Sequence, residues 1–147
     1  MDQTTLQTQY RLLHDLYLLM DYGDSLVLEN YQLTSAQMSI LAILDKKDGK
    51  RLTEISEAIF RSKSTVTRAV DHLEERRLVK RNSDIEDRRA QQLVMTNRGS
   101  EFYKDVHAKL FESVQARFSL LDEQEMHQLI TITAKLRDGL LSFNKPS

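Results

Sequence analysis

The chain has 147 residues, enough for one domain with a sizeable core but short of two independent ones. It contains no Cys, which excludes a disulfide scaffold, a thiol nucleophile, a Cys-ligated zinc ion and a thiol redox sensor. The net charge of −1 is unevenly distributed: residues 61–98 hold ten Lys or Arg against six Asp or Glu, whereas residues 1–60 hold five against nine. A basic excess confined to one segment favours a local polyanion-binding surface.

One Pro and four Gly leave few forced helix breaks, so a mainly α-helical chain is predicted. The first helix is expected from Thr5 to about Glu29. Its apolar residues form two stripes: Leu6, Tyr10, Leu13, Tyr17 and Met20 on one, and Leu12, Leu16 and Leu19 on the other. Two stripes on one helix mean that more than one face is covered. The lack of a signal-like N-terminus and of a bilayer-spanning apolar run predicts a cytoplasmic protein.

Two short helices are expected next. Thr34 is predicted to cap a helix through Leu44, with Gln37 completing a capping box, and Asp48-Gly49 should end it. A second helix should open at Thr53. Its expected inward residues are Ile55, Ala58 and Ile59.

A turn at Phe60-Arg61 leads to a helix with Ser62 as its N-cap. Its buried face is predicted from the spacing i, i+3, i+4 and i+7 of Val66, Ala69, Val70 and Leu73. The opposite side carries Ser64, Thr65, Arg68, Asp71 and His72, with Thr67 at its margin. The two helices on either side of the turn have helix-turn-helix spacing, so this helix is the candidate for entering a major groove.

Two strands, Leu78 to Asn82 and Gln91 to Thr96, are predicted to form a basic hairpin, the wing. Its tip, SDIEDRRA, contains Asp87-Arg88-Arg89. A cationic hairpin of this kind can reach a minor groove beside the helix.

Two long helices should complete the chain. Thr96 starts the first, whose apolar stripe is Phe102, Val106, Leu110, Val114 and Phe118. Asp122 and Glu125 cap the second, which carries Met126, Leu129, Ile130, Thr133, Leu136 and Leu140. The terminal helices hold more apolar surface than a small core can cover, which favours a homodimer. We therefore expect a single domain over 1–147, with a DNA-binding lobe at 34–99 and dimerisation helices at 1–33 and 100–147.

The sequence resembles the MarR family of bacterial transcription regulators along nearly its whole length. The matching motifs are LTEISEAI, SKSTVTRAVDHLE, LVKR, DIEDRRAQQLVMT and NRG. The resemblance implies a homodimeric winged helix-turn-helix regulator, most often a repressor, on a pseudo-palindromic DNA operator. Two departures concern turns: Phe60 and Arg77 stand where many relatives have Gly, so a left-handed conformation at Arg77 would carry strain and put the entry angle of the wing in doubt.

In such a winged helix-turn-helix regulator, the candidates for base or phosphate contacts are Ser64, Thr65 and Thr67. Arg68 can reach a guanine edge or a phosphate. His72 is equally consistent with a phosphate contact and with simple exposure. Phosphate contacts are expected from Lys63, Lys80 and Arg81, together with Arg61 and Arg98. At the wing the resemblance favours Arg89 as the minor-groove finger, oriented by Asp87, with Arg88 along a phosphate or folded back. The alternative is a solvated helix face and a merely solubilising turn.

The sequence has no metal-ligand spacing among its His residues and no nucleophile, phosphate-loop or acid and base motif, so neither a metal site nor an enzyme is predicted. A protein-interaction winged helix is the alternative class. Relatives often bind small aromatic acids or phenolic compounds between lobe and dimerisation helices, so we expect no cofactor beyond such an effector. The residues that can approach this crevice, unless they are simply core, are Tyr17, Met20, Met38, Tyr103 and His107.

Overall fold

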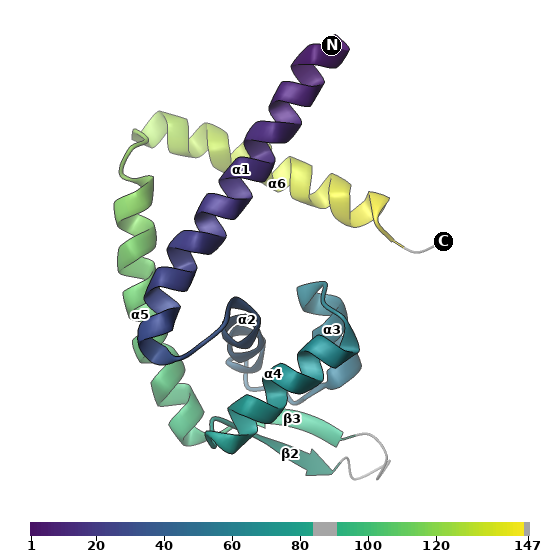
Figure 1. Cartoon of the computed structure of the whole chain (residues 1–147), viewed down its shortest axis with the longest axis vertical. Helices are drawn as coiled ribbons and strands as arrows, with labels where there is room; N and C mark the ends of the chain where they lie inside the picture. Colours follow the sequence, from purple (N-terminus) through teal and green to yellow (C-terminus); the bar gives the residue numbers. More distant parts are fainter. Residues whose placement is uncertain (84–90, 146–147) are drawn as a thin grey trace. The chain divides into compact units, whose positions relative to one another are not determined.

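The computed structural model describes residues 1–83 and 91–145, and it confirms a mainly helical chain with a small winged sheet (Figure 1). The elements are α1 (Gln3–Leu28), η1 (Glu29–Tyr31), α2 (Ser35–Leu44), β1 (Lys50–Arg51), α3 (Leu52–Ile59), α4 (Lys63–Glu75), β2 (Val79–Ser83), β3 (Gln91–Met95), α5 (Asn97–Phe118) and α6 (Glu123–Phe143). Two compact units are distinguished, Met1–Ser113 and Val114–Ser147. In the described part of the chain no helix is both long and apolar enough to cross a membrane.

Helix α1 begins two residues earlier than predicted, because Asp2 is its N-cap and accepts a 2.8 Å hydrogen bond from the Thr5 amide. That bond lowers the pKa of the Asp2 carboxyl, since it stabilises the charged form. Leu28, near the junction with η1, is buried. The apolar residues of both predicted stripes are exposed in the single chain: Leu6, Leu12, Leu13, Leu16, Leu19, Tyr10, Tyr17 and Met20.

Helix α2 has the predicted capping box, with Thr34 Oγ1 accepting from the Gln37 amide at 3.2 Å and Gln37 Oε1 accepting from the Thr34 amide at 2.9 Å. The prediction that Asp48-Gly49 ends this helix is wrong. The residue that turns the chain is Lys47, with φ 63°, and its amide bonds the Leu44 carbonyl at 3.1 Å. Helix α2 therefore ends at Leu44, as predicted, but the turn that follows it is centred on Lys47, two residues before the glycine.

Helix α3 starts one residue before the predicted Thr53, because the Glu54 carboxylate accepts a 3.0 Å hydrogen bond from the Arg51 amide. Ile55 is fully buried and Ile59 partly buried, as expected. Ala58 is exposed, so its assignment to the inner face was wrong. The inner face is centred instead on positions i, i+3 and i+7, which adds Leu52 to the two isoleucines and turns Ala58 outward.

The wing belongs to a three-stranded antiparallel sheet in the order β1-β3-β2, not to a two-stranded hairpin. Lys50 and Arg51 of β1 pair with Leu93 and Gln92 of β3. A two-residue strand has too short a pattern to be seen in sequence. Strand β2 runs one residue later than predicted and β3 ends one residue earlier, with Val79 opposite Met95 at the base of the wing.

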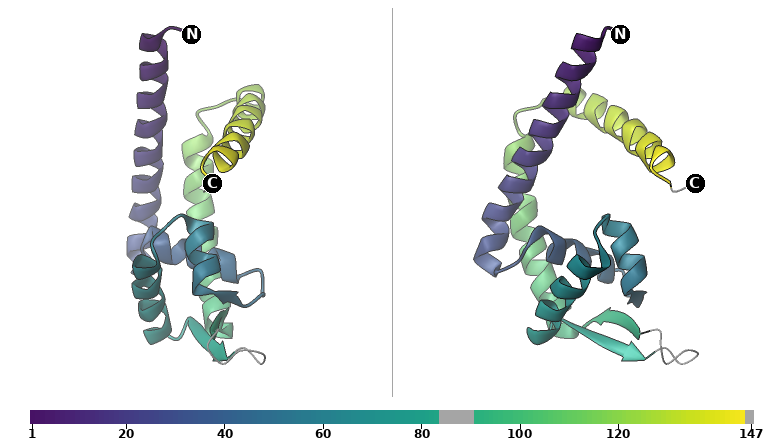
Figure 2. Two further views of the ribbon diagram at one scale, coloured as in Figure 1. Left: turned by 90° about the vertical axis from the view of Figure 1, so that its right-hand side faces the viewer. Right: turned by 45° about the vertical axis from the view of Figure 1, so that its right-hand side comes forward.

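Helix α4 contacts α2, α3 and the sheet, and these elements gather in one lobe in all views (Figures 1 and 2). Its predicted inner face is confirmed, since Val66, Ala69, Val70 and Leu73 are buried. The surrounding core includes Ile40, Leu41, Leu44, Ile55, Leu78, Val79, Leu93 and Val106. Burial of a branched side chain of this size stabilises the fold by roughly 1.5–3 kcal/mol.

In the second unit, α6 has the predicted capping box: Asp122 Oδ1 accepts from the Glu125 amide at 2.8 Å, and Glu125 Oε2 accepts from the Asp122 amide at 2.9 Å. Its large apolar side chains are exposed in the single chain: Ile130, Ile132, Leu136, Leu140, Leu141 and Phe143. Among the described residues of this unit, this apolar surface stays uncovered.

Candidate nucleic-acid interface

The N-terminus of α4 carries a cluster of hydroxyl groups. Ser62 Oγ accepts from the Thr65 amide at 3.2 Å, and it lies 3.1 Å from Ser64 Oγ and 2.9 Å from Thr65 Oγ1. Ser64 and Thr65 are exposed, whereas Thr67 is half-buried and donates to the Lys63 carbonyl at 2.8 Å. Short hydroxyl side chains and the free amides of a helix N-terminus together form a surface that can approach phosphates or base edges closely.

The long side chains of the same face are also exposed. Lys63 and Arg68 are exposed, and the predicted position of Arg68 on the side opposite the buried face of α4 agrees with this. His72 is 61 % exposed, and its Nδ1 lies 3.7 Å from the carboxylate of Glu75 one turn later. Both side chains are exposed, so any attraction between them is weak.

Arg81 and its neighbour Lys80 differ in their surroundings. Lys80 is exposed on β2. The Arg81 guanidinium is held 2.8 Å from an Asp71 carboxylate oxygen, with its Nε 3.5 Å from Glu74 of α4. These contacts tie the first wing strand to the candidate recognition helix, and no local pattern in the sequence indicates this role. Contact of Arg81 with a phosphate stays a prediction.

The predicted finger residues Asp87, Arg88 and Arg89 lie outside the described residues. The strands that lead to them are described as far as the pair Ser83 and Gln91.

The C-terminus of α4 adopts a Schellman motif around a left-handed Arg77, with φ 59°. The Leu78 amide bonds the Leu73 carbonyl at 3.0 Å, and the Arg77 amide bonds the Glu74 carbonyl at 2.9 Å. The accompanying apolar contact is supplied by Leu73 and Leu78, both buried. The expected strain at Arg77 is therefore present, because a side chain makes this conformation unfavourable.

Thr96 and Gly99, which follow the wing, hold this turn in place. Thr96 Oγ1 lies 2.7 Å from the Arg77 carbonyl and 3.1 Å from the Leu78 carbonyl, either of which can accept its proton, and it accepts from the Gly99 amide at 2.9 Å. A Cβ on Gly99 would lie 2.0 Å from the Leu78 carbonyl oxygen. Gly99 is thus required for close approach between the start of α5 and the base of the wing.

Another left-handed turn lies between α3 and α4, at Phe60, with φ 55°. The Arg61 amide bonds the Ser56 carbonyl at 3.2 Å, and Ser56 Oγ donates to the Arg61 carbonyl at 2.6 Å. The Phe60 side chain is 75 % exposed. An aromatic ring that is neither buried nor favoured by the backbone is unusual in a turn.

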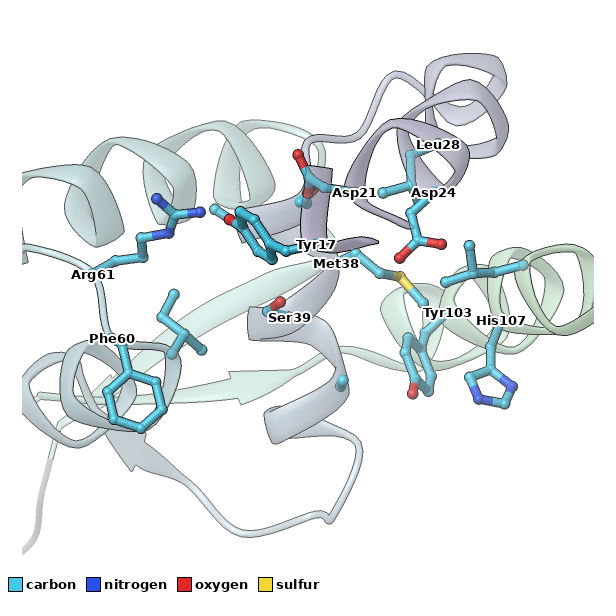
Figure 3. Close-up of a pocket in the computed structure, with 15 residues that line it drawn as sticks. Tyr17, Asp21, Asp24, Leu28, Met38, Ser39, Phe60, Arg61, Tyr103 and His107 are labelled. Carbon is cyan, nitrogen blue, oxygen red and sulfur yellow. Dashed lines mark hydrogen bonds between the residues drawn. The ribbon is translucent and has the colours of Figure 1, made fainter. Parts of the chain in front are cut away.

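Phe60 borders a pocket of about 700 Å³ formed by α1, α2, α5 and the turn after α3 (Figure 3). Its lining comprises Tyr17, Asp21, Asp24, Leu28, Ser35, Ala36, Met38, Ser39, Ala42, Ile59, Phe60, Arg61, Tyr103, His107 and Leu110. Four of the five predicted crevice residues line it, and Met20 does not. Figure 3 shows Phe60 and Arg61 at one side and Tyr103 and His107 at the other.

Burial, followed by the negative charge of Asp45, raises the pKa of the Tyr103 phenol, which therefore stays protonated at neutral pH. Its ring lies 5.5 Å from that of His107, centroid to centroid. Asp21 accepts a 3.0 Å hydrogen bond from Ser35. In the described part of the chain, no group of three His, Cys, Asp or Glu residues is arranged to hold a metal ion.

Comparison with known proteins agrees with this geometry. The sequence model of the MarR family matches residues 33–90. The HTH-type transcriptional repressor MdtR of Bacillus subtilis is 36 % identical over 110 residues, which span 74 % of this chain and 70 % of MdtR. The chain belongs to the MarR family.

Solved structures support the same fold for this MarR-family chain. The YusO protein of Bacillus subtilis is 30 % identical with a TM-score of 0.67, and the match covers 94 % of this chain and 99 % of YusO. A MarR mutant of E. coli crystallised with operator DNA is 20 % identical with a TM-score of 0.80, covering 92 % of this chain and 99 % of that one. MarR-family members such as MdtR are transcription regulators and not enzymes, as the sequence predicted for this chain.

Proposed function

We propose that this MarR-family regulator is a homodimeric repressor that binds a pseudo-palindromic DNA operator through two symmetry-related α4 helices. The observation that carries the proposal is the division of α4 into a buried apolar face and an exposed face. The exposed face holds Ser64, Thr65 and Arg68 directly after the helix N-terminus. Hydroxyls, amides and a guanidinium at that position suit phosphate and base-edge contacts. The E. coli MarR mutant was crystallised with operator DNA, and MdtR is named a repressor.

The homodimer is supported by exposed apolar surface on α1 and α6. Eight apolar or aromatic residues of the two α1 stripes are exposed, and so are six large apolar residues of α6. A soluble monomer rarely leaves contiguous apolar surface of this extent in water. We therefore assign residues 1–33 and 100–147 to dimerisation and 34–99 to DNA binding. The dimer would hold its two α4 helices one turn of B-DNA apart, ~34 Å.

We further propose that the pocket beside Phe60 binds a small aromatic effector. The support is its aromatic lining from three elements, Tyr17 of α1, Phe60 of the turn and Tyr103 of α5. Backbone strain at an exposed Phe is also typical of positions kept for binding. Two carboxylates, Asp21 and Asp24, line the pocket against one guanidinium, that of Arg61. That balance favours a neutral phenolic compound over an aromatic acid, because two carboxylates repel a further anion.

An effector at this position would act by changing the distance between the two α4 helices of the dimer. The pocket is lined by α1 and α5, which we assign to dimerisation, and by α2 and the α3–α4 turn of the lobe. A ligand that separates these elements changes the spacing of the two α4 helices and disfavours both half-sites. The proposal needs no metal or organic cofactor and places the protein in the cytoplasm with its DNA.

The test is to capture genomic fragments with the purified full-length protein and sequence them, while light scattering measures its mass in solution. We expect a dimer and one enriched palindrome with half-sites one helical turn apart. A monomer that binds a single asymmetric site would contradict the dimer, and the absence of any enriched sequence would contradict DNA reading altogether. Fluorescence anisotropy with neutral phenols and with aromatic acids at equal concentration then tests the effector class.

A further inference from the structure

Arg76, the C-cap residue of α4, joins the recognition helix to η1, which directly continues α1, and to α5. Its guanidinium donates two hydrogen bonds, from Nη1 to the Gln32 carbonyl at 2.9 Å and from Nη2 to the Tyr31 carbonyl at 3.0 Å. Its Cζ lies 4.9 Å from the centre of the Phe102 ring on α5. In the sequence, Arg76 is one of ten basic residues between 61 and 98, and no pattern distinguishes it from the others.

The chemistry of this contact is specific to an arginine. The two acceptor carbonyls lie at the end of η1, the 3-10 turn that directly follows α1, and Gln32 is left-handed there with φ 53°. The Leu33 amide bonds the Leu28 carbonyl at 3.1 Å, a Schellman closure that leaves the later carbonyls facing outward. The end of a helix carries partial negative charge, which attracts a cation.

The guanidinium also stacks against an aromatic ring that is itself fixed. The Phe102 ring meets the Tyr31 ring edge to face, with 6.0 Å between centroids and an interplanar angle of 82°. A planar cation can bond two carbonyls and lie on a ring at once, whereas a Lys ammonium cannot span the same three partners in this geometry. Arg76, Tyr31 and Phe102 are all half-buried, so water weakens these contacts less than it would at the surface.

We propose that Arg76 is a positioning residue that sets the angle of α4 against α1 and α5, and thereby the operator half-site spacing that the dimer accepts. This inference rests on the proposed homodimer. Within the lobe, α4 is held by its core face against α2 and α3. Arg76 fixes the far end of α4 to the two helices that we assign to dimerisation, so its contacts set the position of the reading head relative to the dimer and leave the side chains that read bases unchanged.

Arg81 provides a matched control. It is also an arginine that contacts α4, but its partners Asp71 and Glu74 belong to α4 itself, so it joins wing to recognition helix within one lobe. Loss of Arg81 should change how each half-site is bound. It should leave the distance between half-sites unchanged.

The experiment uses the full-length protein and a duplex carrying the palindrome that the wild type selects. The central spacer is shortened or lengthened by one base pair, which moves the half-sites by ~3.4 Å and rotates them by ~35°. Dissociation constants are measured by anisotropy for wild type, Arg76→Met, Arg76→Lys and Arg81→Met, and circular dichroism confirms that each variant is folded.

We expect the wild type to discriminate against both altered spacers, and Arg76→Met to reduce that discrimination by about tenfold while keeping the same preferred half-site sequence. Arg76→Lys should behave like Arg76→Met if the planar two-carbonyl contact is what matters. Arg81→Met should weaken binding by a similar factor at every spacer. An equal loss at all three spacers for Arg76→Met would overturn the inference alone, because it would show a general stabilising role. Failure of the wild type to select any palindrome would overturn the proposed function and this inference with it.

Discussion

Replacement of Arg77 tests whether the left-handed end of α4 stores strain. Arg77 has φ 59°, and its side chain is exposed. A left-handed conformation costs a residue with a Cβ about 1–2 kcal/mol. Glycine removes that cost. However, glycine has more conformational freedom in the unfolded chain, and this lowers the stability of the folded state by roughly 0.5–1 kcal/mol. Arg77→Gly should therefore stabilise the protein by roughly 0.5–1 kcal/mol.

Arg77→Ala is the control, because alanine removes the same side chain and keeps the Cβ. Any loss of exposed side-chain contacts is shared by the two variants, so the difference between them isolates the backbone. In thermal unfolding, 1 kcal/mol corresponds to about 2–4 °C for a chain near this size. We expect Arg77→Gly to melt a few degrees above Arg77→Ala. Equal melting temperatures would refute the claim that this turn is strained.

In thermal unfolding, Gly99→Ala should destabilise the fold by about 1–3 kcal/mol, because its Cβ would lie 2.0 Å from the Leu78 carbonyl oxygen. Gly139→Ala should instead stabilise α6 by up to about 1 kcal/mol, because a Cβ at that position meets nothing within 4 Å. If Arg68 makes a bidentate base contact, Arg68→Ala should weaken operator binding by about 1–3 kcal/mol and reduce base discrimination at one symmetric pair of operator positions. Lys80→Ala should instead weaken binding to all sequences alike and lower the slope of log affinity against log salt concentration by about one. Anisotropy at several salt concentrations measures both effects. The raised pKa of Tyr103 means that the folded state holds this proton more tightly than the unfolded state, so stability should fall as pH rises past about 10, the usual tyrosine value. Denaturant unfolding at a series of pH values should show that the free energy of unfolding falls less steeply with pH for Tyr103→Phe than for the wild type. Parallel pH dependences would contradict the raised pKa.

Local signals predicted much of the fold. The capping boxes at Thr34 and Asp122 and the N-cap at Ser62 lie where the sequence placed them, because each depends on side chains within three residues of the helix start. The inner face of α4 follows from helical periodicity alone. Phe60 and Arg77 stand where many relatives have Gly, and the structure shows that both have positive φ.

Elements without a local signal were decided by tertiary structure. Strand β1 is only two residues long and forms because it pairs with β3, so the sequence contains no alternating pattern that predicts it. Ala58 is compatible with either side of α3, and the packing of the lobe turned it outward.

The same division applies to the candidate site. The exposed face of α4 follows from the spacing of residues along one helix, so the sequence alone determines it. Arg76 reaches carbonyls 44 and 45 residues away, and Arg81 pairs across 10 residues with Asp71. A long cation has many possible partners in sequence, and the folded backbone selects among them. Which arginines face outward and which hold the lobe together is therefore a property of the tertiary structure.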